Sequence, residues 1–297
     1  MTNSPTIRRA THLDVAKLVF VGAIWGASFI FIALALKSFG PITVAAGRIS
    51  LAAVVLLVIS FAAGYRFKYS LADWRKMILI GSLNSGLPFF LISWGMQFIS
   101  SAEAAILMAS GTFFALIISH FASSDERFNT NRVIGVSVGF CGVILLVIHD
   151  LIFSESGSLK GQIAMILAGL SYASSSVLSR RISHIPALPA SASILSCTSI
   201  YMLSLAFFFE GPIHSDPEPM AVLALVALGV LGTAIAYVIR LQIIANNGAV
   251  FMSQIGYLVP LFAVIWSWLF LSEAIGVATV AALVAILLGI AITRRGT

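Results

Sequence analysis

The sequence has few charged residues, and this shortage decides the class of protein. Only 9% of the 297 residues are charged, whereas 60% are hydrophobic, and the mean hydropathy is +1.05. Soluble globular domains carry about 25% charged residues, so a soluble fold is excluded. An outer-membrane barrel is excluded as well, because its strands alternate apolar and polar residues and the apolar runs here are continuous. The sequence therefore predicts an all-α integral membrane protein.

Carboxylates are missing from the interior of the apolar runs. No Asp or Glu lies near the middle of any run, and Glu103, at the end of one of them, comes nearest. Proton-coupled antiport of organic cations typically needs a buried carboxylate, because an ionisable group within the membrane has to exchange the proton for the cation. The absence therefore favours a neutral or zwitterionic substrate, and it leaves proton coupling and facilitated diffusion both open.

Motifs of several other protein classes are missing too. The sequence has no Gly-Lys-Ser/Thr phosphate loop, so we expect no ATP hydrolysis. Its five histidines are scattered, so we expect no cofactor, no metal site and no enzyme. No run carries the ring of charges that would line a channel. The net charge of +6 does not indicate nucleic-acid binding, because the basic residues lie in short loops that orient a chain in a membrane.

Apolar runs long enough to cross a bilayer occur ten times along the chain. The connections between them are short, and the ten predicted spans cover residues 16–36, 41–64, 77–98, 102–121, 132–149, 161–183, 187–209, 220–243, 249–271 and 275–293. A single offset of 147 residues superimposes the first five spans on the last five and pairs Gly22 with Gly169 and Ser28 with Ser175. Because five is an odd number, the second copy is inserted upside down. The sequence thus predicts ten transmembrane helices arranged as two inverted five-helix repeats, residues 1–150 and 151–297.

The distribution of Lys and Arg predicts the orientation of the chain. The loops on the second side carry only Lys37 and Lys160 together with five acidic residues. The basic residues on the first side are Arg8, Arg9, Lys17, Arg66, Lys68, Arg75, Lys76, Arg127, Arg132, Arg180, Arg181, Arg294 and Arg295. By the positive-inside rule the first side is cytoplasmic. We therefore expect a multi-pass protein of the bacterial inner membrane with both termini in the cytoplasm.

The stretch 228–273 indicates moving parts. Two apolar runs are joined there by the polar turn Asn246-Asn247-Gly248, and the second run carries Pro260 near its middle. A proline inside a membrane helix removes a backbone hydrogen bond and kinks the helix, which is tolerated where neighbours or a wet cavity satisfy the freed carbonyl. The positions predicted as hinges are Gly81, Gly86, Pro88, Gly111, Gly229, Gly232 and Pro260.

Several motifs resemble those of a known superfamily. The motifs are Trp25-Gly26, Gly47-Arg48, the run Gly232-Thr233-Ala234-x-Ala236-Tyr237, Pro260 and Leu271-Ser272-Glu273. Together they resemble the drug/metabolite transporter superfamily, and within it the ten-helix EamA-type exporters, over essentially the whole chain. Within that group the chain resembles the bacterial exporters of aromatic and other neutral amino acids of the YddG type. It departs from the pattern at Phe113, which stands at the position paired with Pro260, so the hinge of the fourth span is expected at Gly111.

Two aromatic residues are candidates for substrate contact. The 147-residue offset pairs Trp25 with Tyr172, and each lies near the middle of its span, whereas aromatic residues of membrane proteins usually gather at the interfaces. Two platforms facing a central cavity would stack on a flat apolar substrate, and bulky packing between helices is the alternative. Ser28 and Ser175 lie one turn further along the same faces, where small hydroxyls also serve close helix packing.

Buried polar groups complete the candidate site. Asn84 sits in an apolar run, and its amide has to find partners, either on a substrate or on another helix. Tyr237, Gln254 and Tyr257 face the same choice. Arg48 is the most deeply placed charge, and such a residue is by default a functional candidate. It fits either a substrate carboxylate or a structural contact between helices.

The hypothesis that combines these observations is a secondary transporter. It would export small metabolites, aromatic and other neutral amino acids above all, by alternating access through a central cavity. A permease for sugars or nucleosides is the alternative, since aromatic walls suit those solutes too. A membrane-embedded enzyme or a channel fits less well. The expected partners are a small-molecule substrate and the lipid bilayer, and we expect a monomer or a weak homodimer.

Overall fold

The computed structural model describes residues 10–122, 130–153, 158–212 and 216–294, and these contain helices and no strand. Arg8, Arg9, Arg127 and Arg295, used above for the orientation, lie outside the described residues. The helices of the first half are α1 (His12–Ala35), α2 (Pro41–Ala62), α3 (Leu71–Gly81), α4 (Leu87–Gly95), α5 (Ser101–Met108), α6 (Gly111–Ala122) and α7 (Thr130–Phe153). Those of the second half are α8 (Ser158–Ser179), α9 (Ala187–Glu210), α10 (Pro219–Gly229), α11 (Ala236–Met252), α12 (Ile255–Leu271) and α13 (Val277–Arg294).

The helices form the ten predicted spans. Within the described ranges, eight helical stretches have the length and hydropathy to cross a membrane, and two shorter apolar helices, Ile255–Leu271 and Val277–Thr293, complete the set. The third span joins α3 to α4 through a π-helical segment, η1 (Ser82–Gly86), and the eighth joins α10 to α11 through η3 (Val230–Ile235). The fourth span is α5 followed by α6. The all-α, ten-helix fold class is therefore confirmed.

The contacts between helices follow the inverted repeat. Helix α1, the first span, packs against α12 of the ninth span, and α8, the sixth span, packs in the same way against α6 of the fourth. Gly22 on α1 and its repeat partner Gly169 on α8 lie at these two contacts: a Cβ at Gly22 would meet Leu258, and one at Gly169 would meet Gly111. Spans that correspond to each other also pair directly, α2 with α9 and α7 with α13.

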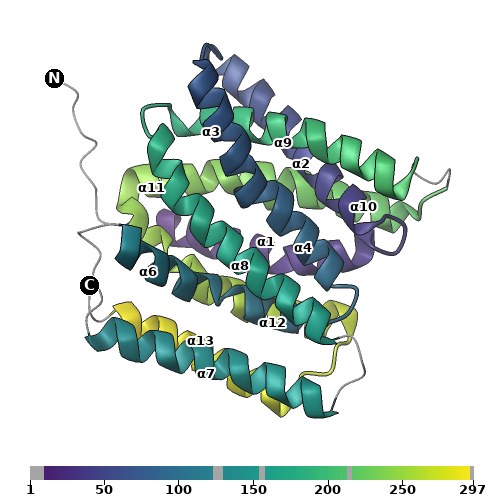
Figure 1. Cartoon of the computed structure of the whole chain (residues 1–297), viewed down its shortest axis with the longest axis vertical. Helices are drawn as coiled ribbons and strands as arrows, with labels where there is room; N and C mark the ends of the chain where they lie inside the picture. Colours follow the sequence, from purple (N-terminus) through teal and green to yellow (C-terminus); the bar gives the residue numbers. More distant parts are fainter. Residues whose placement is uncertain (1–9, 123–129, 154–157, 213–215, 295–297) are drawn as a thin grey trace.

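Helices α7 and α13 form a pair at one edge of the bundle (Figure 1). Their backbones touch at glycines, since a Cβ on Gly289 would lie 2.6 Å from the carbonyl oxygen of Gly135 and 2.9 Å from the Cα of Gly139. Small residues let membrane helices approach closely. The small-residue face of α7 is therefore occupied within the chain by α13.

The helix interruption of the ninth span lies before Pro260. Helix α12 runs continuously through Pro260, and the chain turns earlier, at Ser253 and Gln254, between α11 and α12. The break that the sequence predicts at the proline is thus displaced by about two turns of helix. Pro260 still leaves the carbonyl of Gly256, four residues earlier, without its N–H donor. The turn predicted at Asn246-Asn247-Gly248 is present, with φ +85° at Gly248.

Glutamates at the ends of two spans hold the beginnings of two others. The carboxylate of Glu210, at the end of α9, accepts the backbone N–H groups of Ile42 and Thr43 at 2.8 Å each. Glu273, just beyond α12, accepts those of Ser101 and Ala102 at 2.9 and 3.2 Å. A helix N-terminus has unpaired N–H groups and a partial positive charge, so a carboxylate stabilises it. Both contacts join the two repeats on the same side of the bundle.

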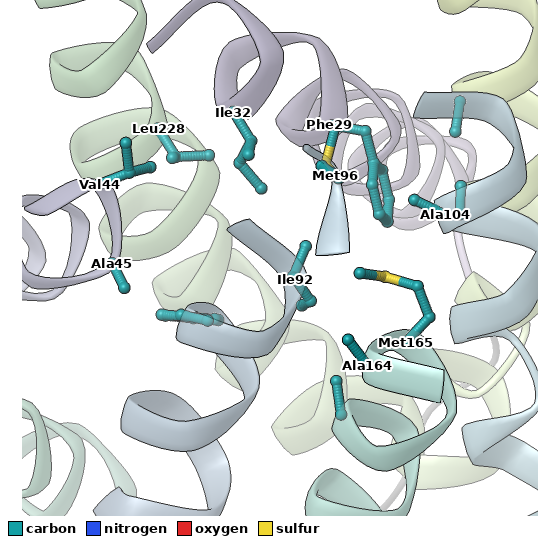
Figure 2. Packing of buried hydrophobic residues seen from close by; sticks show 14 of the residues in the cluster. Phe29, Ile32, Val44, Ala45, Ile92, Met96, Ala104, Ala164, Met165 and Leu228 are labelled. Atoms are coloured by element: carbon teal, nitrogen blue, oxygen red, sulfur yellow. The ribbon is translucent and has the colours of Figure 1, made fainter. Parts of the chain in front are cut away.

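An apolar cluster fills the space between the repeats. Figure 2 shows side chains of α1, α4 and α8 converging there, including Phe29, Ile32, Ile92 and Met165, each no more than 7% exposed. Small residues such as Ala104 and Ala164 let the helices approach each other around these large side chains. This cluster closes the centre of the bundle next to the cavity described below.

Candidate functional site

A cavity of about 420 Å³ lies where the two repeats meet. Its wall is built from α1, α2, the two π-segments with the helices beside them, α5, α6, α8, α9 and α12. Phe29, Ile32 and Ile92 belong both to this wall and to the apolar cluster, so part of the wall is the packed core itself. Its size and mainly apolar lining are those of a site for a small molecule.

Five of the eight predicted contact residues line this cavity, namely Trp25, Ser28, Asn84, Tyr172 and Tyr237. The remaining three are placed elsewhere. Ser175 lies behind the wall, where its hydroxyl donates to Oδ1 of Asn84 at 3.2 Å and to the carbonyl of Tyr172 at 2.8 Å. Gln254 is exposed in the turn before α12, and Tyr257 packs against the apolar cluster. The cavity therefore brings together the repeat-related aromatic pair and the half-buried amide of Asn84.

Trp25 connects the first span to a π-segment. Its indole Nε1 donates to the carbonyl of Gly232 in η3 at 3.0 Å. On α8, the first helix of the second repeat, the hydroxyl of Ser171, next to Tyr172, donates to the carbonyl of Leu83 in η1 at 2.8 Å. A π-segment lacks regular i→i−4 pairing, and such segments are frequent at functional sites. In both repeats the first helix thus supplies a side-chain donor to the π-segment of the other repeat.

Arg48 makes the contact between helices that was one of the two roles left open by the sequence. Its Nε donates to the hydroxyl oxygen of Thr233 in η3 at 2.8 Å, which joins α2 to the eighth span. Thr233 in turn donates to the carbonyl of Leu228, five residues earlier in the π-turn, at 3.0 Å. The guanidinium carbon lies 3.8 Å from the centroid of the Phe89 ring, a cation–π contact. Arg48 is only 8% exposed, yet it also lines the cavity.

Six of the seven residues predicted as hinges lie at or near helix interruptions around the cavity. Gly81 directly precedes η1, Gly86 is its last residue, and Pro88 follows in α4. Gly229 precedes η3, Gly232 lies inside it, and Gly111 begins α6 after the break at Ala109 and Ser110. Pro260 lies in the continuous part of α12, and it lines the cavity together with Gly256. The carbonyl freed by Pro260 therefore belongs to a residue of the cavity wall.

Several wall residues were not singled out from the sequence. Thr233 stands in the Gly-Thr-Ala run that carries part of the family resemblance, and that run was the available signal. Phe89 and Ser191 have no local signature that separates them from other apolar-run residues. Arg240 also lines the cavity, with its guanidinium carbon 5.4 Å from the centroid of the Tyr237 ring.

The chain is similar to known proteins over most of its length. The chain is 26% identical to the uncharacterized transporter YoaV of Bacillus subtilis, over 87% of this chain and 88% of that protein. It is 27% identical to an uncharacterized transporter of Archaeoglobus fulgidus, over 89% and 90%. A crystal structure with 20% sequence identity superimposes with a TM-score of 0.67, covering 96% of this chain and 98% of the other, which shows the fold.

A family profile matches the chain twice. The profile of the EamA-like transporter family matches residues 15–148 and again residues 159–295, one match in each five-span half. The two matches cover nearly the whole chain and coincide with the repeat that surrounds the cavity. The chain therefore belongs to the EamA-like transporter family.

Proposed function

We propose that this transporter exports aromatic and other neutral amino acids through the cavity between its repeats. The observation that carries the proposal is the position of Trp25 and Tyr172, a repeat-related aromatic pair that lies in the wall of the 420 Å³ cavity. Aromatic faces stack on flat apolar groups, and the surrounding wall is largely apolar with a few polar side chains. Such a cavity suits an aromatic side chain attached to a small polar head.

The transport mechanism is alternating access. Inverted repeats can exchange conformations, so that a structure open to one side has a counterpart open to the other. The π-segments η1 and η3 and the break before Gly111 lie around the cavity, where small changes of helix direction alter its opening. The hinges are the glycines and prolines at these places. The two repeats are residues 1–150 and 151–297, rigid bundles of their helices rock about these hinges, and one chain builds the whole cavity, so a monomer is sufficient.

The protein resides in the bacterial inner membrane with both termini in the cytoplasm. Lys and Arg of the loops at one end of the bundle support this orientation. In this orientation Glu210 and Glu273 close the periplasmic ends of the repeats. Arg240, placed toward the opposite end of its span, marks the cytoplasmic part of the cavity wall.

Flux in proteoliposomes tests the proposal. Vesicles containing only this protein are loaded with unlabelled L-phenylalanine, and entry of labelled aromatic, small neutral and charged amino acids is followed with and without a proton gradient. We expect exchange of the aromatic and neutral amino acids and none of lysine or glutamate. Absence of flux for every amino acid would contradict the substrate assignment, and sugars and nucleosides would then be tested in the same vesicles.

A further inference from the structure

The wall of the cavity has a one-sided charge. Among the described residues it contains two arginines, Arg48 and Arg240, and no aspartate or glutamate. A charge inside a membrane protein is costly unless a partner compensates it. An ammonium group of a substrate would find no carboxylate in this wall, whereas an anionic group would find a guanidinium.

The donors of Arg48 are largely unused. A guanidinium has five N–H donors, and only Nε has a hydrogen-bond acceptor among the described residues, the Thr233 hydroxyl at 2.8 Å. The contact with the Phe89 ring at 3.8 Å and the Thr233 bond hold the group in place without neutralising its charge. The terminal nitrogens of Arg48 therefore remain available to a bound anion, in the paired geometry that suits a carboxylate.

Asn84 offers a second donor in the same wall. Its Oδ1 accepts the hydroxyl hydrogen of Ser175 at 3.2 Å, and its amide N–H₂ group has no acceptor in the part of the chain that the structure describes. Asn84 lies in η1, on the third span, whereas Arg48 lies on the second. Asn84 is half-buried and lines the cavity, so the two hydrogens of its amide can be bonded by a ligand there.

Arg48 has no cationic counterpart at the repeat-related position of the other half. The offset of 147 residues pairs Arg48 with Leu195, which also lines the cavity. One half of the wall therefore provides a guanidinium where the other provides an aliphatic side chain. A ligand with a polar head and an apolar body therefore binds in one orientation, with its head toward Arg48.

We infer that Arg48 and Asn84 form a carboxylate-binding subsite, and that this site accepts aromatic carboxylates whether or not they carry an α-amino group. The inference rests on the aromatic cavity of the proposed function and specifies which part of the substrate is recognised. Aromatic acids that lack the amino group then compete with aromatic amino acids for the same cavity, and aromatic amines that lack the carboxylate do not.

Binding of three matched ligands to the purified full-length protein tests this inference by calorimetry. L-Phenylalanine carries both groups, 3-phenylpropionate only the carboxylate, and phenethylamine only the ammonium. We expect the first two to bind with affinities within about threefold of each other and phenethylamine to bind at least about tenfold more weakly, since a hydrogen bond to a charged group contributes about 1.5–3 kcal/mol. Equal affinity for phenethylamine and 3-phenylpropionate, or a requirement for the amino group, would overturn the inference without any mutation.

Two substitutions at repeat-related positions locate the subsite. Arg48→Gln is expected to weaken binding of 3-phenylpropionate by about tenfold or more and to leave phenethylamine unchanged. Leu195→Gln places the same side chain at the paired wall position and is expected to keep the preference for the carboxylate. Unchanged affinity of Arg48→Gln for 3-phenylpropionate would overturn the subsite even where phenylalanine flux is normal. Binding of 3-phenylpropionate that depends on Arg48, without any phenylalanine flux, would uphold the subsite and contradict the amino-acid assignment instead.

Discussion

Replacing Trp25 with alanine is expected to reduce L-phenylalanine flux by about tenfold or more per folded protein. The substitution removes an aromatic face from the cavity wall and the indole N–H that holds the carbonyl of Gly232 at 3.0 Å. An aromatic pair contributes about 0.5–1.5 kcal/mol beyond its buried area, and a hydrogen bond about 1 kcal/mol. The two losses together correspond to about a tenfold or larger effect. The reduction is measured as L-phenylalanine flux in proteoliposomes, normalised to the amount of folded protein.

Trp266 provides a matched control for this prediction. It joins α12 to α1, because its Nε1 donates to the carbonyl of Ala23 at 3.0 Å. It is half-buried like Trp25, but it does not line the cavity. Trp266→Ala should therefore lower stability to a similar extent and leave flux per folded protein near that of the wild type. If Trp25→Ala and Trp266→Ala lose flux equally, Trp25 contributes only to helix packing, and the predicted contact with substrate is contradicted.

Gly26→Ala is expected to prevent α1 from packing against α12 at its present distance. A Cβ at this position would lie 2.7 Å from Cβ of Phe262 and 2.8 Å from the backbone nitrogen of Ala263. A backbone atom cannot move aside as the end of a long side chain can, so the two helices have to separate. Overpacking of this kind costs about 1–3 kcal/mol, and we expect a clearly lower melting temperature in a thermal-shift measurement on the purified protein.

Gly256 serves as the comparison for Gly26. It lies at the start of α12, and a Cβ there would meet nothing closer than the Thr112 hydroxyl, at 3.8 Å. Gly256→Ala should therefore melt within about a degree or two of the wild type, because a surface-like change without a clash usually stays within about 0.5 kcal/mol. A melting temperature of Gly26→Ala equal to that of Gly256→Ala would show that α1 and α12 are not in tight contact.

Much of the fold follows from the sequence because a bilayer allows few solutions. Continuous apolar runs have to be helices in lipid, since each backbone group must be hydrogen-bonded within its own segment. The odd number of spans per repeat then imposes the inversion. The same offset that aligns the spans pairs Trp25 with Tyr172, and both lie in the cavity wall. The repeat therefore indicates a pair of cavity residues that neither Trp25 nor Tyr172 indicates by itself.

The finer placement of the site depends on features without a local sequence signature. The π-segments η1 and η3 rotate the residues that follow them relative to an unbroken helix, so a regular helical period misplaces side chains on these spans. The predicted span 249–271 places Gln254 within a helix, but the residue lies in the turn before α12 and is exposed. The same early turn leaves Pro260 within a continuous helix. Ser175 was expected beside the substrate, and it supports Asn84 from behind.

Arg48 shows why two interpretations of one residue need not exclude each other. The sequence allows a structural contact between helices, and the bond from Nε to Thr233 provides one. The depth of the charge suggested substrate binding, and the position in the cavity wall is compatible with that as well. A guanidinium has enough donors for both tasks, and residue type with sequence position cannot show how they are divided.

Protection of a single cysteine by substrate tests the central claim, that the transported amino acid occupies the cavity between the repeats. In a background with Cys141 and Cys197 replaced by serine, Ala109→Cys introduces a thiol in the cavity wall, and Ala63→Cys introduces one at the exposed end of α2. Saturating L-phenylalanine is expected to slow maleimide labelling at position 109 and to leave labelling at position 63 unchanged. Identical labelling rates at position 109 with and without phenylalanine, in a protein that transports it, would contradict the account.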